Sequence, residues 1–149
     1  MGLFQNFDIA ASGMTAQRFR MDTIAENIAN VNTTRTEDGS GPYRRKVVVF
    51  AEKELNPSFS DSLKSYMRSF KGNGVKVTRV YEDHETDLIM EYDPSHPDAD
   101  ENGYVSYPNV NTVTEMTNLI DASRAYQANV TAFEGMKQIA QQGISIGSS

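Results

Sequence analysis

The stretch FDIAASGMTAQRFRMDTIAENIANV, residues 7–31, places apolar side chains at alternating spacings of three and four. Such spacing puts one stripe of side chains along a helix and suits lengthwise packing against another helix. Good helix formers fill the segment, and Asn30, Thr33 and Thr34 supply a stop, so we predict a helix from about residue 4 to residue 30. The stripe consists of Phe7, Ala10, Met14, Gln17, Met21, Ile24, Ile28 and Val31.

A matching rhythm runs through the C-terminal part of the chain and predicts a second long helix. We expect it to begin after Asn111 and Thr112, either of which can act as the N-cap, and Glu115 would complete a capping box with Thr112. Gly143 and Gly147 are expected to end it, near residue 142. Its stripe consists of Met116, Leu119, Ser123, Tyr126, Val130, Phe133, Lys137, Ala140 and Ile144.

Two long helices at the ends of one chain are natural packing partners, and both stripes contain polar positions. Gln17, Ser123 and Lys137 favour association that is specific rather than maximally tight. Gly13 lies inside the first helix at a cost of about 1 kcal/mol relative to alanine, which marks a kink or a close helix approach. The pattern is typical of a subunit that assembles.

The chain between the helices changes to the period of β-strands. Short β-type runs cover residues 43–50, 74–81, 86–92 and 103–107, and residues 55–74 read as a loop that can hold a short helix. The predicted fold class is α+β, with long N- and C-terminal helices packed in coiled-coil fashion and a small β-rich middle domain. The predicted segments are 1–34, the N-terminal helix and turn; 35–111, the middle domain with an irregular stretch near 52–73; and 112–149, the C-terminal helix.

Composition and length limit the classes of protein to which the chain can belong. The chain has 149 residues, 38% of them hydrophobic, and a net charge of −6. About 80 residues lie outside the helices, enough for a small sheet and too few for a deep catalytic cleft. The chain has no cysteine, which excludes disulfides and thiolate zinc sites. No segment approaches the roughly 20 apolar residues that span a bilayer, and no secretory signal is recognisable at the N-terminus, so we expect no direct membrane insertion.

Charge is divided within the middle of the chain. Residues 35–80 hold ten Lys and Arg against five Asp and Glu, whereas residues 82–101 hold nine acidic side chains and no Lys or Arg. Such runs are often two solvated faces. Alternatively, a basic patch on one subunit meets an acidic patch on the next and sets their register. The basic residues are not interleaved with a stacking platform and the chain is acidic overall, so nucleic-acid binding is not expected.

Motifs for chemistry are weak. Residues 98–103, DADENG, match the first six positions of an EF-hand calcium loop, but Asn109 stands where position twelve requires glutamate. A turn leading into a strand is favoured over calcium binding. His84 and His96 are isolated and are expected to be solvated. The sequence contains no nucleophile elbow and no glycine-rich phosphate loop, so we predict no enzyme activity, no metal and no cofactor.

Several blocks of the sequence resemble a known family. The segment SGMTAQRFRMDTIAENIANVNT, residues 12–33, is similar to the N-terminal signature of the bacterial flagellar rod and hook axial proteins, although Glu26 stands where that signature usually has asparagine. Further blocks resemble the proximal-rod branch of that family, in the family's order: GPYRR (41–45), VVVF (47–50), GVKV (74–77), YDPSHPDADENGYV (92–105), PNVN (108–111) and ASRAYQAN (122–129). Residues 52–71 match less well, and we assign them no inherited role.

The resemblance implies a structural subunit of the flagellar basal body. Members of this family pair their terminal helices and pack them against those of neighbours, both further copies and other rod proteins. Together they form the inner tube of the rod, which transmits motor torque and surrounds the export channel. They leave the cytoplasm through the flagellar type III export apparatus, without a cleavable signal peptide, and their terminal regions tend to be poorly ordered before assembly.

Assembly contacts are therefore expected from the two stripes, whose alternative role is packing within one subunit. The residues assigned to assembly are Phe7, Met14, Met21, Ile24, Ile28, Val31, Met116, Leu119, Tyr126, Val130, Phe133 and Ile144. The signature residues Asn27, Ala29, Asn30 and Thr33 are expected to fix the turn after the first helix, through side-chain to backbone hydrogen bonds. The alternatives are another rod or hook-type axial subunit, a small calcium-binding module, and a hydrolase that uses acidic residues from 82–101.

Overall fold

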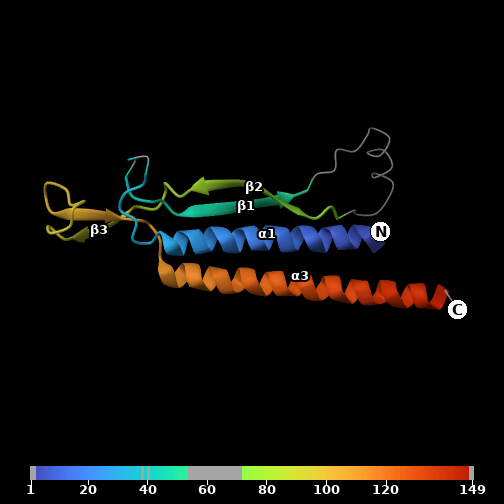
Figure 1. The fold of residues 1–149 in the computed structure, drawn as a ribbon. Helices are drawn as coiled ribbons and strands as arrows, with labels where there is room; N and C mark the ends of the chain where they lie inside the picture. Colours follow the sequence, from blue (N-terminus) through green and yellow to red (C-terminus); the bar gives the residue numbers. More distant parts are fainter. Residues whose placement is uncertain (1–2, 38, 40, 54–71, 148–149) are drawn as a thin grey trace, which may run out of the picture. The chain divides into compact units, whose positions relative to one another are not determined.

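The computed structural model describes residues 3–37, 39, 41–53 and 72–147. Two long helices and four strands follow one another along the chain (Figure 1). In order they are α1 (Leu3–Ala29), β1 (Lys46–Glu52), β2 (Val75–Glu82), β3 (Ile89–Tyr92), β4 (Tyr104–Tyr107) and α3 (Thr112–Gly147). The predicted α+β class is thus confirmed, and the four predicted β-type runs contain the four strands to within a few residues.

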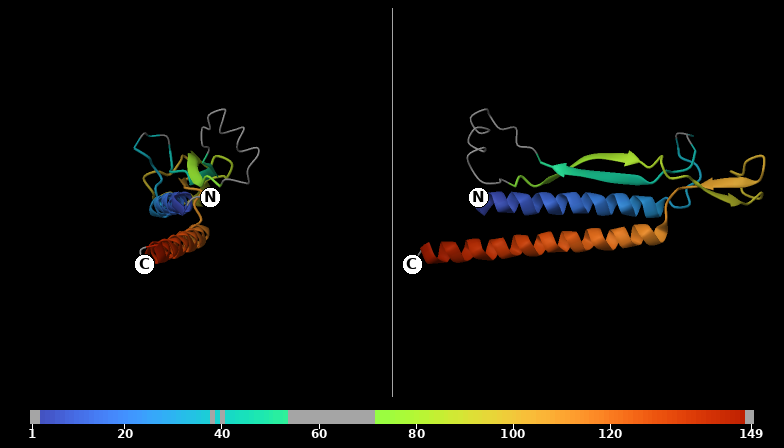
Figure 2. Two further views of the ribbon diagram at one scale, coloured as in Figure 1. Left: turned by 90° about the vertical axis from the view of Figure 1, so that its right-hand side faces the viewer. Right: turned by 180° about the vertical axis from the view of Figure 1, so that it is seen from behind.

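The chain forms two compact units, and neither is a continuous stretch of sequence. Unit 1 comprises Met1–Arg18, Phe50–Thr78 and Ser123–Ser149, and unit 2 comprises Phe19–Val49 and Arg79–Ala122. Each unit therefore contains part of α1, part of the two-stranded β1–β2 sheet and part of α3. Within each unit, α1 lies between the β1–β2 sheet and α3 (Figure 2). The division into residues 1–34, 35–111 and 112–149 stays a prediction.

Unit 1 is held by small residues and by one aromatic pair. The rings of Phe7 on α1 and Phe133 on α3 meet edge to face, with centroids 4.9 Å apart. A Cβ on Gly13 would lie 2.7 Å from Oδ1 of Asn129, so the glycine allows a close approach of the two helices, as the sequence suggested. Ser12 Oγ accepts a 3.0 Å hydrogen bond from the backbone N–H of Val75 and so ties α1 to β2.

Unit 2 contains most of the buried apolar side chains and the second hairpin. Strands β3 and β4 pair antiparallel, from Ile89 opposite Tyr107 to Tyr92 opposite Tyr104. Among the described residues, the buried apolar side chains of this unit are Ile24, Tyr43, Val105, Pro108, Val110 and Ala122, whereas those of unit 1 are Ala10 and Ala16. Few large apolar side chains within the described ranges are therefore fully buried.

Two details of the predicted C-terminal helix are wrong. The helix does not end near residue 142 but continues to Gly147, because Gly143 does not adopt the positive φ by which a glycine ends a helix. The N-cap is Asn111, whose Oδ1 accepts a 3.0 Å hydrogen bond from the backbone N–H of Thr114. Glu115 forms no capping box, since its side chain turns inward. The short helix allowed within residues 55–74 falls largely outside the described residues.

Candidate functional site

Asn27 joins three elements of unit 2 although it lies in the last turns of α1. Its side chain is fully buried. Nδ2 donates hydrogen bonds to the carbonyl oxygen of Lys46 (2.9 Å) and to Oε2 of Glu115 (3.1 Å). Oδ1 accepts hydrogen bonds from the backbone N–H of Lys46 (2.8 Å) and from the hydroxyl of Tyr43 (2.9 Å). Both donors and both acceptor positions of the amide are therefore used, and they tie α1 to β1 and α3.

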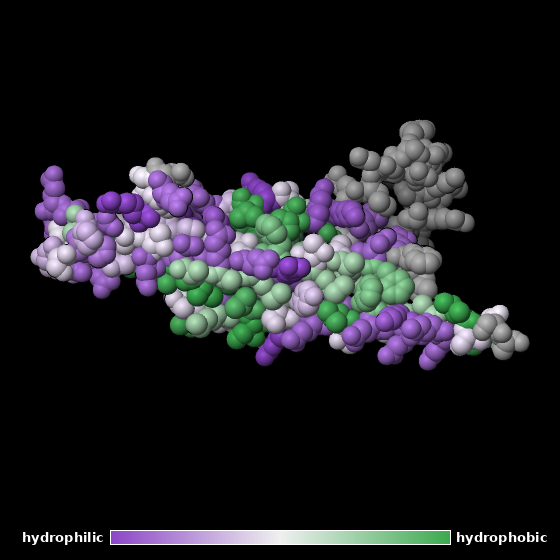
Figure 3. Space-filling model, viewed as in Figure 1, coloured by the Kyte–Doolittle hydropathy of each residue, from purple (hydrophilic) through white to green (hydrophobic). Residues whose placement is uncertain are grey.

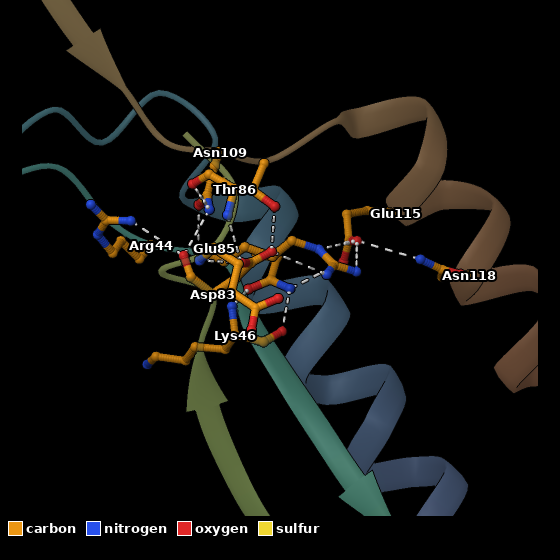
Figure 4. A network of polar contacts seen from close by, with 10 residues as sticks. Arg44, Lys46, Asp83, Glu85, Thr86, Asn109, Glu115 and Asn118 are labelled. Carbon is orange, nitrogen blue, oxygen red and sulfur yellow. Dashed lines mark hydrogen bonds and ion pairs between the residues drawn. The ribbon is translucent and has the colours of Figure 1, made fainter. Parts of the chain in front are cut away.

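Glu115 on α3 is the most unusual residue of this cluster, because its side chain is only 1% exposed. Arg45 donates to its Oε1 through Nε (2.9 Å) and Nη2 (2.8 Å), and Asn118 Nδ2 lies 3.4 Å from the same oxygen. Figure 4 shows the dashed contacts that reach the Glu115 carboxylate, one of them from Asn118 on the same helix. A carboxylate is tolerated inside a protein only when it is paired and hydrogen-bonded. We call Asn27, Arg45 and Glu115 the polar latch.

A second amide holds the arginine of the latch in place. Asn109 Oδ1 accepts a 2.9 Å hydrogen bond from the backbone N–H of Arg45. Its Nδ2 donates to the carbonyl oxygens of Asp83 (2.9 Å) and Thr86 (3.1 Å). Because Asn109 is buried and anchored on both sides, the backbone that carries Arg45 has little freedom to shift.

Two titratable groups beside the latch have displaced pKa values. Hydrogen bonds from the backbone and the hydroxyl of Thr86 lower the pKa of Asp83, and the nearby Arg45 guanidinium, 3.9 Å away, adds to this. Burial raises the pKa of the Tyr43 phenol well above its ordinary value, and the Glu26 carboxylate raises it further. Both shifts favour the protonation states that prevail at neutral pH.

The four signature residues fall into two groups. Asn30 and Thr33 lie in the turn, where Asn30 Nδ2 donates to the carbonyl oxygen of Glu26 (2.9 Å) and Thr33 Oγ1 donates to Oδ1 of Asn30 (3.1 Å). Ala29 is the exposed last residue of α1. The interpretation of Asn27 as a turn residue is wrong, because its hydrogen bonds run to β1 and α3.

The stripe predicted on α1 faces inward to differing degrees. Ile24 is buried, whereas Phe7, Met14, Met21, Ile28 and Val31 are half-buried. Of these, Phe7 is paired with an aromatic residue of the other stripe, Phe133. Val31 lies in the turn beyond the end of the helix.

The stripe predicted on α3 is exposed at both ends, in unit 2 because the helix is rotated and beyond residue 140 because the helix is exposed on all sides. Leu119, Tyr126, Val130 and Phe133 are half-buried, whereas Met116 is 52% exposed and Ile144 is 73% exposed. In unit 2 the fully inward residues of α3 are Glu115 and Ala122 instead. Each lies one position before a predicted stripe residue, and one residue turns a helix by about 100°.

An outward apolar stripe results on the uncovered side of α3. In unit 2 it consists of Val113, Met116 and Ile120, all more than half exposed. In unit 1 Ile139, Ile144 and Ile146 are exposed as well. Nothing in the sequence pattern marks these residues as a separate set, because the heptad rhythm assigns some of them to the inward side.

The acidic turn is closed by its own backbone. Asp100 Oδ1 accepts 2.8 Å hydrogen bonds from the backbone N–H groups of Asn102 and Tyr104, and Gly103 has a positive φ of 82° just before β4. Asp98 accepts hydrogen bonds from Thr34 and Arg35. This is the turn leading into a strand that the sequence favoured. Among the described residues, no group of three or more His, Asp or Glu is placed to hold a metal ion.

The two histidines and the basic residues differ in part from expectation. His84 is exposed, but His96 is half-buried and its Nδ1 accepts a 3.1 Å hydrogen bond from the backbone N–H of Asp98, so the expectation of a solvated His96 is wrong. Three of the basic residues expected to meet a neighbour form ion pairs within unit 2. They are Arg35 with Asp98, Arg45 with Glu115, and Lys46 with Glu26.

Comparison with known proteins identifies the family. The family described as "Flagella basal body rod protein" matches residues 7–35, and "Flagellar basal body rod FlgEFG protein C-terminal" matches residues 101–146. The flagellar basal-body rod protein FlgC of Borreliella burgdorferi is 44% identical to the chain, and the alignment covers 98% of each. The chain belongs to the FlgC family. The FlgC proteins of Bacillus subtilis and Salmonella typhimurium are 43% and 37% identical, with 99% of each chain covered.

Both matched segments of this FlgC-family chain contain residues of the latch or of the stripes. Residues 7–35 include Asn27 and the α1 stripe, and residues 101–146 include Glu115 and the whole α3 stripe. No helix in the part of the chain that the structure describes is long and apolar enough to cross a membrane.

Proposed function

We propose that the chain is a structural subunit of the flagellar basal-body rod, in its proximal part, and that it polymerises through its terminal helices. Other rod proteins and further copies of the chain are its neighbours in the assembly. The polymer transmits motor torque around the export channel, and the subunit reaches it through the flagellar type III export apparatus. Identities of 37–44% to FlgC proteins of several bacteria, over nearly the whole of each chain, support the rod assignment.

The observation that carries the assembly mechanism is the outward apolar stripe of α3. Val113, Met116 and Ile120 leave large apolar side chains in water on one side of unit 2. Hydrophobic side chains also gather at the surface along the helices in Figure 3. Contiguous exposed apolar surface on a protein usually marks a contact with another macromolecule. A neighbouring subunit that covers this stripe would remove its apolar surface from water, which favours assembly.

The stripe residues assigned from the sequence contribute to assembly in two ways under this proposal. Met116 and Ile144 meet neighbouring subunits directly. Ile24, Phe133 and the half-buried residues of both stripes hold α1 against α3, so that the outward side is presented correctly. Ile24 is consequently a poor test of assembly, because its burial means that a charge there would also damage the subunit.

A structural role also fits the chemistry of the described side chains. Both carboxylate oxygens of Asp98 accept hydrogen bonds from Thr34 and Arg35, and Oδ1 of Asp100 accepts two from the backbone of the turn, which leaves calcium binding without support beyond the DADENG match. Another alternative is a different rod or hook-type axial subunit, but identities of 43–44% to FlgC proteins over nearly the whole length favour the FlgC assignment.

Negative charges introduced into the outward apolar stripe by substitution test the proposed assembly role. We expect Met116→Asp and Ile120→Asp, expressed in place of the natural chain, to abolish swimming and to remove the chain from purified hook–basal-body particles. Thr114→Asp is the control, since Thr114 is exposed on the same turns but points about 100° or more away from each of the three stripe residues. Circular dichroism of the purified subunits should be alike for all three. Normal swimming of both stripe variants would contradict the proposal.

A further inference from the structure

The orientation of α3 in unit 2 is not the one that apolar patterning alone would select. The seven-residue rhythm places Met116 on the side facing α1, yet Met116 is 52% exposed and Glu115 is 1% exposed. Adjacent residues of a helix point about 100° apart, so Glu115 and Met116 cannot both face α1. A methionine has been left in water and a carboxylate has been buried. Something other than apolar burial must hold α3 in this rotation.

The donors that receive Glu115 are also held by contacts that do not involve α3. The amide of Asn27 has two hydrogen bonds to the backbone of Lys46, at 2.8 and 2.9 Å, which orient it independently of Glu115. The backbone of Arg45 is held by Asn109. The latch thus presents one amide and one guanidinium at a set position beside α1, and the Glu115 carboxylate satisfies both, with one oxygen for each donor.

We propose that the polar latch sets the rotation and register of α3, and thereby selects which apolar residues are offered to neighbouring subunits. With Glu115 inward, Val113, Met116 and Ile120 form the outward stripe. With Met116 inward, that stripe would be lost against α1 and Glu115 would face water. A single buried polar contact is known to specify register in helical assemblies at some expense of stability. The part of this inference that concerns neighbours rests on the proposed rod function.

A different register of α3 along α1 is disfavoured because it would break the hydrogen bonds of the latch. A slip of α3 by one heptad would bring Ala122 opposite Asn27 and would leave Asn27 Nδ2 and the Arg45 guanidinium without their acceptor. Unpaired buried donors are costly, whereas small apolar residues such as Ala122 fit many positions equally well. The latch therefore discriminates between arrangements that the apolar residues hardly distinguish.

Thiol labelling of the full-length subunit tests the rotation directly, because the chain contains no cysteine. Ile120→Cys reports the outward side, since Ile120 is 53% exposed, and Ala122→Cys reports the inward side, since Ala122 is 0% exposed. Each reporter is placed in three backgrounds: the natural latch, Asn27→Ala with Arg45→Met, and the same pair with Glu115→Leu added. The rate of reaction with a small maleimide is measured for each.

Opposite changes at the two reporters are the expected result. Without the donors, the Glu115 carboxylate must reach water, so labelling should slow at position 120 and accelerate at position 122, each by about tenfold or more. Adding Glu115→Leu should restore the original rates, because an apolar residue can then stay inward. Arg44→Met is the matched control and should change neither rate, since Arg44 makes one 3.3 Å contact, to the Asp83 carbonyl oxygen.

Three results would overturn the inference. Unchanged rates at both reporters would mean that the latch does not set the rotation. Fast labelling at both reporters when the donors are removed would mean that the latch holds the fold as a whole. Fast labelling at position 122 with the natural latch would mean that the latch does not orient α3 in the free subunit. These rates are measured without assembly, so they are independent of the swimming test of the rod function.

Discussion

Replacing Arg45 by methionine should destabilise the subunit by far more than a surface substitution does. The change removes two hydrogen bonds, of 2.9 and 2.8 Å, from a carboxylate that is 1% exposed. Removing one partner of a buried ion pair typically costs about 3–5 kcal/mol. The Arg45 side chain is 27% exposed, and Asn27 still donates to Glu115, so we expect the lower end, about 3 kcal/mol.

The double variant makes this prediction specific to the ion pair. Arg45→Met combined with Glu115→Met removes both charges, and replacing a buried ion pair by apolar residues of similar volume is often close to neutral. Asn27 then loses one acceptor, worth about 1 kcal/mol, while it keeps its bonds to Lys46. The double variant should therefore lie within about 1–2 kcal/mol of the natural chain and be more stable than Arg45→Met alone.

Urea unfolding of the purified chain, followed by circular dichroism at 222 nm, measures both differences. With a urea dependence of about 2 kcal/mol per molar, the single variant should lower the midpoint by about 1.5 M. Arg44→Met serves as the control and should shift it little. The reasoning is refuted if the double variant is no more stable than Arg45→Met, because the loss would then not arise from an unpaired buried carboxylate.

Three further predictions concern glycine and pH. Gly74→Ala should lower the free energy of unfolding by at least about 1 kcal/mol, because Gly74 has a φ of 84° and an added Cβ would lie 2.3 Å from Ser12 Oγ. Gly135→Ala is the control: Gly135 has open space around it, so this variant should raise that free energy by about 0.5–1 kcal/mol. Equal effects of the two substitutions in urea unfolding would contradict this prediction. The pKa of Asp83 is lowered in the folded state, so its carboxylate stabilises the fold above the ordinary pKa near 4, and this contribution is lost as the pH falls through the lower folded value. Asp83→Asn should therefore weaken the fall of the unfolding free energy at acid pH. An unchanged acid part of the stability curve would count against this role. The pKa of Tyr43 is raised in the folded state, so its neutral phenol stabilises the fold fully below about pH 10, and this contribution is lost as the pH rises further. Tyr43→Phe should therefore weaken the loss of stability at alkaline pH. An identical alkaline loss in the two proteins would refute the role of this phenol.

The elements of the fold could be predicted from the sequence because they are encoded by local periodicity. The three-and-four spacing from Phe7 to Val31 marks α1, and the matching spacing marks α3. The glycine at position 13 correctly indicated a close helix approach, since only the absence of a Cβ makes room for Asn129. The DADENG segment was recognisable as a turn because Asp, Asn and Gly satisfy the backbone locally.

The polar latch could not be predicted, because its contacts are not local. Glu115 is bonded to Asn27, 88 residues away, and to Arg45, 70 residues away. Read alone, Glu115 resembles a capping residue in the first turn of a helix, where acidic side chains are common. Apolar spacing predicts the helix orientation that would bury the most apolar area. Here a buried polar contact turns α3 away from that orientation by about 100°, the rotation of one residue. The exposure of Met116 on the outward side follows from that override.

The central claim, that the chain is a subunit of the flagellar rod, is tested most directly by quantitative mass spectrometry of purified hook–basal-body particles from the native bacterium. The account predicts that the chain is present in these particles in a small, fixed number of copies per particle. Its absence from the particles, with the protein recovered free in the cytoplasm of swimming cells, would contradict it.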